Sequence, residues 1–217
     1  MSARDTALRV LSAGRTASAW ADASLKAQLR RDGLTGADAA LATRIVYGVL
    51  QNRALLDFYL GAYCSQKLSR LQPPLADILR IGAYQILFLD KVPDRAAVNE
   101  SVELAKKNGR GAASGLVNAV LRKLSLNKAQ LPAIPERDEA QALSIRYSHP
   151  KWLVRRLLAL LGREEAESFL AADNAVAPLT VQVNTLRTTA AALTARLADA
   201  GVTAAAHPWV PDCLELT

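Results

Sequence analysis

The stretch that decides the fold is PPLADILRIGAYQI, residues 73–86. Its two prolines stand where the first turn of a helix tolerates them, because the first amides of a helix have no acceptor within it. After the prolines, apolar or small residues recur at three- and four-residue spacing: Leu75, Ile78, Leu79, Gly82 and Ile86. This spacing predicts a helix that packs into a core.

The same helical pattern extends over residues 1–126, which show almost no strand pattern. Thr35 and Asp38 have the spacing of a capping box, and Asp94 is a suitable N-cap for another helix. Further apolar residues at helical spacing lie within 7–11, 41–49, 98–105 and 116–124. Residues 1–126 are therefore predicted to form an all-helical bundle.

Residues 127–138, with Pro132 and Pro135, are the best candidate linker. Residues 139–217 follow another pattern, which predicts helices at about 139–147, 151–161, 163–172 and 189–200 and strands at 179–184, 202–206 and 214–217. The expected fold class is mainly α, a helical bundle followed by a connector and the start of a small α/β subdomain. Because the sequence ends at Thr217 within a strand, we expect the chain to be truncated.

The positive charge is concentrated in the first part of the chain. Residues 1–130 hold 19 Lys and Arg against 10 Asp and Glu, a balance of +9, whereas residues 131–217 hold 8 against 10, a balance of −2. A strongly basic domain favours a polyanionic partner, above all a nucleic acid. A charge excess that only aids solubility is the alternative.

Several classes of protein are disfavoured. No apolar stretch approaches the roughly 20 residues of a membrane span, and the N-terminus lacks the apolar core of a secretion signal. Cys64 and Cys213 are far apart, which disfavours a disulfide framework or a zinc site and fits the cytoplasm. His149 and His207 have no metal ligand at the usual spacing, so no metal is expected.

The stretch 109–115, GRGAASG, looks like a dinucleotide-binding loop but fails two tests. Ser114 stands where the third glycine belongs, and a helix precedes the loop where the fingerprint requires a strand. No serine elbow, phosphate loop or paired carboxylates occur either. We therefore expect no cofactor in this chain.

The order of the motifs resembles the core of the NusB family, small helical RNA binders of transcription antitermination. The resemblance lies in Tyr47-Gly48-Val49-Leu50 with Leu56-Asp57, in residues 80–85, in Val92-Pro93, in residues 97–106, and in residues 115–122. Small residues in these motifs let helices approach closely. Asn99, Glu100 and Asn118 are interpreted as structural hydrogen-bonding residues.

Residues 146–154, RYSHPKWLV, resemble the signature that follows the NusB-like domain in the Sun/RsmB family. Asp173-Asn174, Pro178 and residues 183–187 continue this match into an RRM-like α/β subdomain. The family consists of S-adenosylmethionine-dependent methyltransferases acting on carbon 5 of cytosine in 16S ribosomal RNA. One departure is Gln182, where the family usually has arginine.

The resemblance also implies what these 217 residues lack. In the family, a strand with an aspartate and a Pro-Gly-Gly-Lys loop hold the methyl donor, and later cysteines attack the base. None of these motifs occurs here, so no catalytic residue is expected, and S-adenosylmethionine belongs to a missing catalytic domain. We expect Tyr147, His149 and Trp152 to be structural anchors, with Trp152 buried.

The leading hypothesis, from this resemblance, is the N-terminal RNA-recognition region of such a methyltransferase, inactive by itself, which positions ribosomal RNA of the small subunit through phosphate contacts. Aromatic residues make up only 5% of the chain, so base stacking is expected to be minor. The candidate RNA contacts are Arg4, Arg9, Lys106, Lys107, Arg110, Arg122 and Lys123. For Lys106 and Lys107 the alternative is helix termination, because cations suit the last turn of a helix.

Two other functions stay open. One is a free-standing NusB-type antitermination factor that binds RNA. The other is a helical protein–protein adaptor whose charge only aids solubility. Sequence beyond Thr217 would separate the first two hypotheses, and the salt dependence of RNA affinity would separate both from the adaptor.

Overall fold

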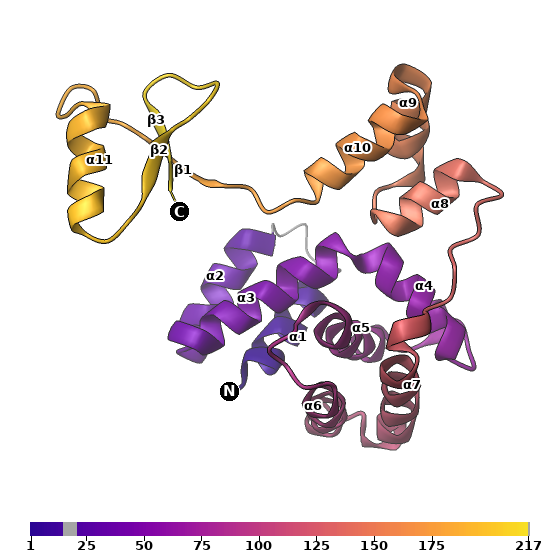
Figure 1. Cartoon of the computed structure of the whole chain (residues 1–217). Coiled ribbons are helices and arrows are strands. Elements are labelled where there is room, and N and C mark those ends of the chain that lie inside the picture. Colours follow the sequence, from indigo (N-terminus) through magenta and orange to yellow (C-terminus); the bar gives the residue numbers. More distant parts are fainter. Residues whose placement is uncertain (15–20, 217) are drawn as a thin grey trace. The chain divides into compact units, whose positions relative to one another are not determined.

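The computed structural model describes residues 1–14 and 21–216, which form two compact units, Met1–Ala171 and Ala172–Thr217 (Figure 1). Thr217 itself lies outside the described residues, so the expected last strand is described only as far as Leu216. No helix among the described residues is long and apolar enough to cross a membrane.

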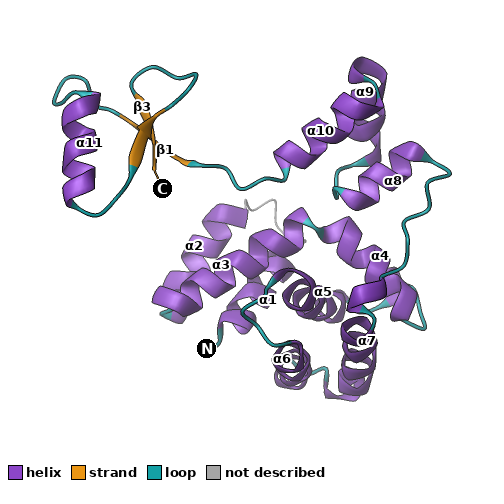
Figure 2. Cartoon of the chain, in the orientation of Figure 1, coloured by secondary structure: helices purple, strands orange, loops and turns teal. Residues whose placement is uncertain are grey.

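The regular secondary structure of the first unit is helical in its described residues, and loops join the helices (Figure 2). Its bundle consists of α1 (Ala3–Ala13), α2 (Ala21–Asp32), α3 (Gly36–Gln51), α4 (Arg53–Tyr63), α5 (Pro73–Phe88), α6 (Asp94–Lys107) and α7 (Ser114–Leu126). Three 3-10 turns lie between or after these helices: η1 (Leu68–Arg70), η2 (Gly111–Ala113) and η3 (Lys128–Gln130). The all-helical bundle predicted for residues 1–126 is confirmed.

Helix α5, which contains residues 73–86, lies at the centre of the bundle (Figure 1). It packs against α1, α3, α4, α6 and α7, and every residue from Leu75 to Ile86 is buried. A helix with neighbours on every side needs apolar or small residues all round. Its buried polar residues must therefore find partners within the protein.

Two glycines of the NusB-like motifs lie where helices approach closely. A Cβ atom on Gly48 of α3 would lie 1.9 Å from Cζ of Tyr84 in α5. A Cβ atom on Gly82 of α5 would lie 2.4 Å from Cδ1 of Leu121 in α7. The expectation that small residues permit close helix packing is confirmed at both positions.

Arg80 is a buried charge of the bundle that has two carboxylate partners. Its guanidinium donates to the carboxylate of Asp57 at 2.7 and 2.8 Å and to Asp77 at 2.8 Å. Burial acts to lower the pKa of Arg80, but the hydrogen bonds and charges of Asp57 and Asp77 outweigh it and hold that pKa above its usual value. This ion pair joins α4 to α5.

Helices α8 (Glu139–Arg146), α9 (Lys151–Leu161) and α10 (Arg163–Asp173) complete the first unit and agree with the predicted ranges. The side chain of Asp138 caps α8 by accepting a hydrogen bond from the amide of Gln141 at 3.0 Å. The three helices enclose a small core of their own, formed by Ala140, Leu143, Val154 and Leu170. Helix α8 also packs against α4.

The second unit is a small α/β fold of β1 (Leu179–Gln182), α11 (Ala190–Asp199), β2 (Ala204–Ala206) and β3 (Cys213–Leu216). The sheet is antiparallel in the order β1-β3-β2, and Leu214 of the central strand pairs with Val181 on one side and Ala206 on the other. The predicted class, a helical region followed by a small α/β part, is confirmed.

Some local predictions were wrong. Thr35 is the N-cap of α3, but its side chain makes no capping hydrogen bond. The capping box instead lies at α1, where Ser2 and Asp5 bond reciprocally. Pro93 is the N-cap of α6, which places Asp94 in the first turn.

Candidate nucleic-acid interface

Five of the seven candidate RNA contacts lie on the hairpin formed by α6, η2 and α7 (Figure 1). The two helices run in opposite directions. Ser125 near the end of α7 lies beside the start of α6, where its hydroxyl donates a hydrogen bond to Asp94 at 2.9 Å. Lys106 and Lys107 end α6, Arg110 lies in the connection, and Arg122 and Lys123 lie near the end of α7.

Burial explains why these cations face outward. Helix α7 buries Val117, Val120, Leu121 and Leu124 against the bundle. At 3.6 residues per turn, Arg122 and Lys123 then fall on the opposite side, and both are exposed. The apolar positions that build the core therefore also fix where the basic side chains point.

The cations of the hairpin differ in their partners. Lys106 forms an ion pair with Glu103 at 2.8 Å, one turn earlier in α6. Lys107, Arg122 and Lys123 are exposed, and no ion pair or side-chain hydrogen bond links them to a described residue. Arg122 and Lys123 can therefore bind an external anion without first breaking an internal contact, whereas the hydrogen bond from Lys106 and also the charge of Lys107 lower the pKa of the Glu103 carboxylate.

Arg4 and Arg9 have internal partners instead. The Nε of Arg4 donates to Oε1 of Gln85 at 2.8 Å, and its side chain is only 15% exposed. An Nη of Arg4 also lies 3.7 Å from a carboxylate oxygen of Glu100, which gives Glu100 a structural contact. Arg9 pairs at 3.1 Å with Asp32, whose side chain is 3% exposed. Contact of Arg4 or Arg9 with RNA stays a prediction.

A groove between α6 and α7 adds a residue that the sequence reasoning missed. It has a volume of about 340 Å³ and is lined by Arg95, Val98, Asn99, Arg122, Ser125 and Leu126. Arg95 lies four residues before Asn99 and hence on the same helix face, which is the signal that could have identified it. The groove therefore presents two guanidinium groups and one amide.

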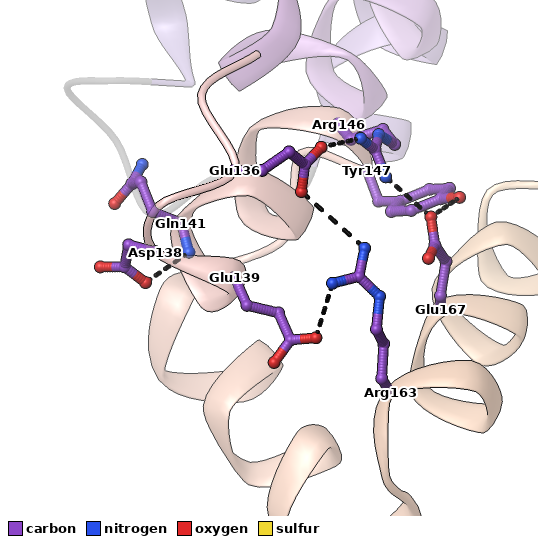
Figure 3. A network of polar contacts seen from close by, with 8 residues as sticks. All are labelled: Glu136, Asp138, Glu139, Gln141, Arg146, Tyr147, Arg163 and Glu167. Carbon is purple, nitrogen blue, oxygen red and sulfur yellow. Dashed lines mark hydrogen bonds and ion pairs between the residues drawn. The ribbon is translucent and has the colours of Figure 1, made fainter.

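The RYSHP segment is structural in its first residues. Tyr147 donates a hydrogen bond to Glu167 of α10 at 3.1 Å, and Arg146 contacts both Glu167 and Glu136 (Figure 3). Arg163 of α10 reaches Glu139 of α8 at 2.9 Å in the same network. These contacts hold α8 to α10, and they hold both helices to Glu136 in the segment before α8.

His149 and Ser144 fix the turn between α8 and α9. Nδ1 of His149 lies 2.7 Å from the carbonyl oxygen of Tyr147, and the hydroxyl of Ser144 donates to the carbonyl oxygen of His149 at 2.6 Å.

The expected anchor role of Trp152 is wrong, because its side chain is 68% exposed on α9. An exposed ring leaves little buried area to lose on truncation.

The remaining candidate sites show no built chemistry. Residues 109–115 follow helix α6 and run into the first turn of α7, so no strand precedes them. Cys64 and Cys213 are free thiols in different units. Within the described parts of the chain, no group of three or more His, Cys, Asp or Glu could hold a metal ion.

Comparisons with known proteins divide the chain into two matched regions. Residues 1–126 match the model of the NusB family. Residues 149–217 match the Methyltr_RsmF/B-like, ferredoxin-like domain.

Curated relatives extend across both regions. "Probable ribosomal RNA small subunit methyltransferase B" of Bacillus subtilis is 32% identical over 216 residues, which cover 99% of this chain and 48% of that protein. "Ribosomal RNA small subunit methyltransferase B" of Pseudomonas putida is also 32% identical, over 100% of this chain and 48% of its own length. The chain thus spans about half the length of these relatives.

A solved structure supports the fold. The crystal structure of PH0851 matches with a TM-score of 0.66 at 19% identity, over 98% of this chain and 48% of that chain. The chain belongs to the NusB family in its first 126 residues, continues into an RsmF/B-like ferredoxin-like domain, and is homologous to the N-terminal half of the RsmB ribosomal RNA methyltransferases.

Proposed function

We propose that this chain is the RNA-binding region of an S-adenosylmethionine-dependent 16S ribosomal RNA cytosine-C5 methyltransferase. The α6–η2–α7 hairpin holds the RNA by its phosphates and presents the target to a catalytic domain outside these 217 residues. The relatives' names and their greater length support this assignment. The methyl donor belongs to that other domain.

The observation that carries the proposal is the set of exposed cations on the hairpin that form no ion pair with a described residue, Lys107, Arg122 and Lys123, with Arg95 beside Arg122 in the groove. Each cation that neutralises a phosphate releases a condensed counterion, and this release drives binding without reading the base sequence. Phosphate contacts fix the orientation of the RNA, which is what a recognition region must supply.

The free-standing antitermination factor is the weaker alternative. The match of residues 149–217 to a methyltransferase-associated ferredoxin-like domain favours the enzyme. The adaptor hypothesis predicts that charge changes on the hairpin leave RNA binding unaffected. One experiment therefore separates the adaptor from both RNA-binding functions.

The test replaces Lys107, Arg122 and Lys123 together by Glu and measures affinity for several 16S ribosomal RNA fragments of different sequence. The matched control makes the same charge change at Lys26, Arg30 and Arg31 of α2, which are exposed as well. We expect the hairpin variant to lose affinity for every fragment by a similar factor, at least about tenfold beyond the control. If both variants lose RNA affinity equally, the net charge of the chain alone explains the loss, and this result would contradict the proposal.

A further inference from the structure

A second hollow lies at the other end of the hairpin, where η1 and the start of α5 meet the connection between α6 and α7. Its volume is about 320 Å³, at the lower end of the roughly 300–1,000 Å³ typical of ligand pockets. It is lined by Gln66, Arg70, Leu71, Gln72, Leu75, Gly109, Arg110, Ala112 and Ala113. The lining thus contains two arginines and no carboxylate.

Arg110 carries the observation that points to a ligand. Its Nε is buried and has no hydrogen-bond partner among the described residues. Nη1 of the same guanidinium reaches only the carbonyl oxygens of Asn108 and Gly109, both at 3.3 Å. A buried donor without an acceptor is costly, so the guanidinium gains stability by shifting to meet an acceptor supplied from outside.

The helix ends around the hollow have the same preference for negative charge. Helices α5 and α7 both start beside it, and neither has an acidic residue in its first turn or a side-chain cap. The partial positive charge of each N-terminus is therefore uncompensated by a side chain. Pro73 and Pro74 lack N–H groups, so α5 contributes only its dipole and the arginines must supply the donors.

We propose that Arg70 and Arg110 form a phosphate-binding site in this hollow. Guanidinium groups suit phosphate because they present several donors in a fixed planar geometry. This inference rests on the proposed function in one respect: the phosphate is a backbone phosphate of the bound RNA. A free phosphate or a phosphorylated small molecule presents the same oxygens, so the experiment distinguishes these sources.

The first arm tests the site without RNA. Inorganic phosphate is titrated into the full chain, and amide NMR shifts are followed, with chloride at equal ionic strength as the reference. We expect saturable shifts at Gly109, Arg110 and Ala112. The affinity for phosphate that they report should be about tenfold weaker in Arg70→Ala and in Arg110→Met. Arg30→Ala on α2 is the control and keeps the wild-type affinity.

Arg110→Met also separates binding from folding. Met retains an aliphatic chain but removes the unpaired donor, so the melting temperature without phosphate should stay close to that of wild type. Stabilisation by a given concentration of phosphate should be smaller in this variant than in wild type, in line with its weaker affinity. The proposed site is overturned if phosphate causes no specific shifts in the wild-type chain. It is also overturned if both variants show the same shifts and affinity as wild type.

The second arm uses a 16S ribosomal RNA fragment. If the phosphate is the RNA's own, Arg70→Ala and Arg110→Met each make the dependence of log affinity on log salt shallower by about 0.7. Phosphate binding at the hollow with an unchanged salt slope for RNA would overturn the RNA assignment and leave a free phosphate ligand. Failure of the proposed function looks different, because the triple hairpin variant would then bind RNA as the α2 control does.

Discussion

The hydroxyl oxygen of Ser148 accepts a hydrogen bond from the backbone N–H of Leu55 at 3.2 Å, across 93 positions of sequence. Leu55 is the third residue of α4, and the N-cap residue of that helix, Asn52, makes no capping hydrogen bond with its side chain. Ser148 therefore supplies from the α8–α9 turn the cap that α4 lacks. Its φ of 55° places it in the left-handed region that few non-glycine residues adopt.

Replacing Ser148 with Ala removes the acceptor but keeps the backbone conformation. We expect the free energy of unfolding to fall by about 1 kcal/mol, the usual cost of losing a helix cap. Chemical denaturation of the full chain measures it, with Ser65→Ala at an exposed position as the control. Equal stability of the two variants would show that the contact does not hold α8 to α4.

Gly48→Ala should destabilise the bundle by about 1–3 kcal/mol, because the new methyl group would overlap the ring of Tyr84. Tyr84 is 7% exposed and stacked on Phe88, so its ring has little room to move. Gly115→Ala is the matched control, since a Cβ there meets nothing within 4 Å and alanine favours the helix. Thermal melts of both variants check the prediction, and a Gly48 variant as stable as the control would refute it.

The loss of folding stability at acid pH should depend in part on Asp32. Burial acts to raise the pKa of Asp32, but hydrogen bonds from Thr6 and Gln28 and the charge of Arg9 outweigh it and lower that pKa. A folded-state pKa below the unfolded value of roughly 3.9 means that the stabilisation is complete above that pH and is lost as the pH falls through the folded-state pKa.

The test compares denaturation of wild type and Asp32→Asn from neutral pH to below pH 3. The variant should be less stable at neutral pH, and the difference from wild type should shrink as the pH falls below about 4. Asp90→Asn, at an exposed carboxylate, is the control. A difference that stays constant with pH would show that the charge of Asp32 is not what Thr6, Gln28 and Arg9 stabilise.

The chain should bind no S-adenosylmethionine. Dinucleotide-type loops need a glycine-rich turn between a strand and a helix, whereas the turn that begins at Gly109 follows helix α6 and leads into helix α7. Calorimetry of the full chain with the methyl donor should give only heats of dilution. Saturable micromolar binding would show a cofactor site that neither the sequence nor the fold accounts for.

Apolar spacing was sufficient to predict most of the fold. Helix α5, the helices from 139 to 173 and the α/β order of the last unit follow from periodicity, because apolar residues recur in their sequences at helical or strand spacing. The role of Gly48 and Gly82 could also be anticipated, since both lie among large apolar residues. Helix α2 was not identified because Leu25 and Leu29 are the only large apolar residues in its sequence, which leaves a weak periodic signal.

The candidate site was harder to predict because side-chain partners are distant in sequence. Arg4 bonds Gln85, 81 positions away, and nothing near Arg4 indicates that contact. Trp152 was expected to be buried because large aromatic rings usually are, yet the small core of α8–α10 is filled by aliphatic residues. The sequence located the basic hairpin, but only the structure distinguished paired cations such as Lys106 from unpaired ones such as Lys107.

The most direct test of the central claim is the salt dependence of RNA affinity for the wild-type chain and the triple hairpin variant at Lys107, Arg122 and Lys123. If about four phosphates are neutralised, log affinity should fall with log salt at a slope near −3 in wild type and near −1 in the variant, because each lost contact removes about 0.7. The α2 control variant should keep the wild-type slope. A flat dependence in wild type, or equal slopes in wild type and the hairpin variant, would contradict phosphate binding by the hairpin.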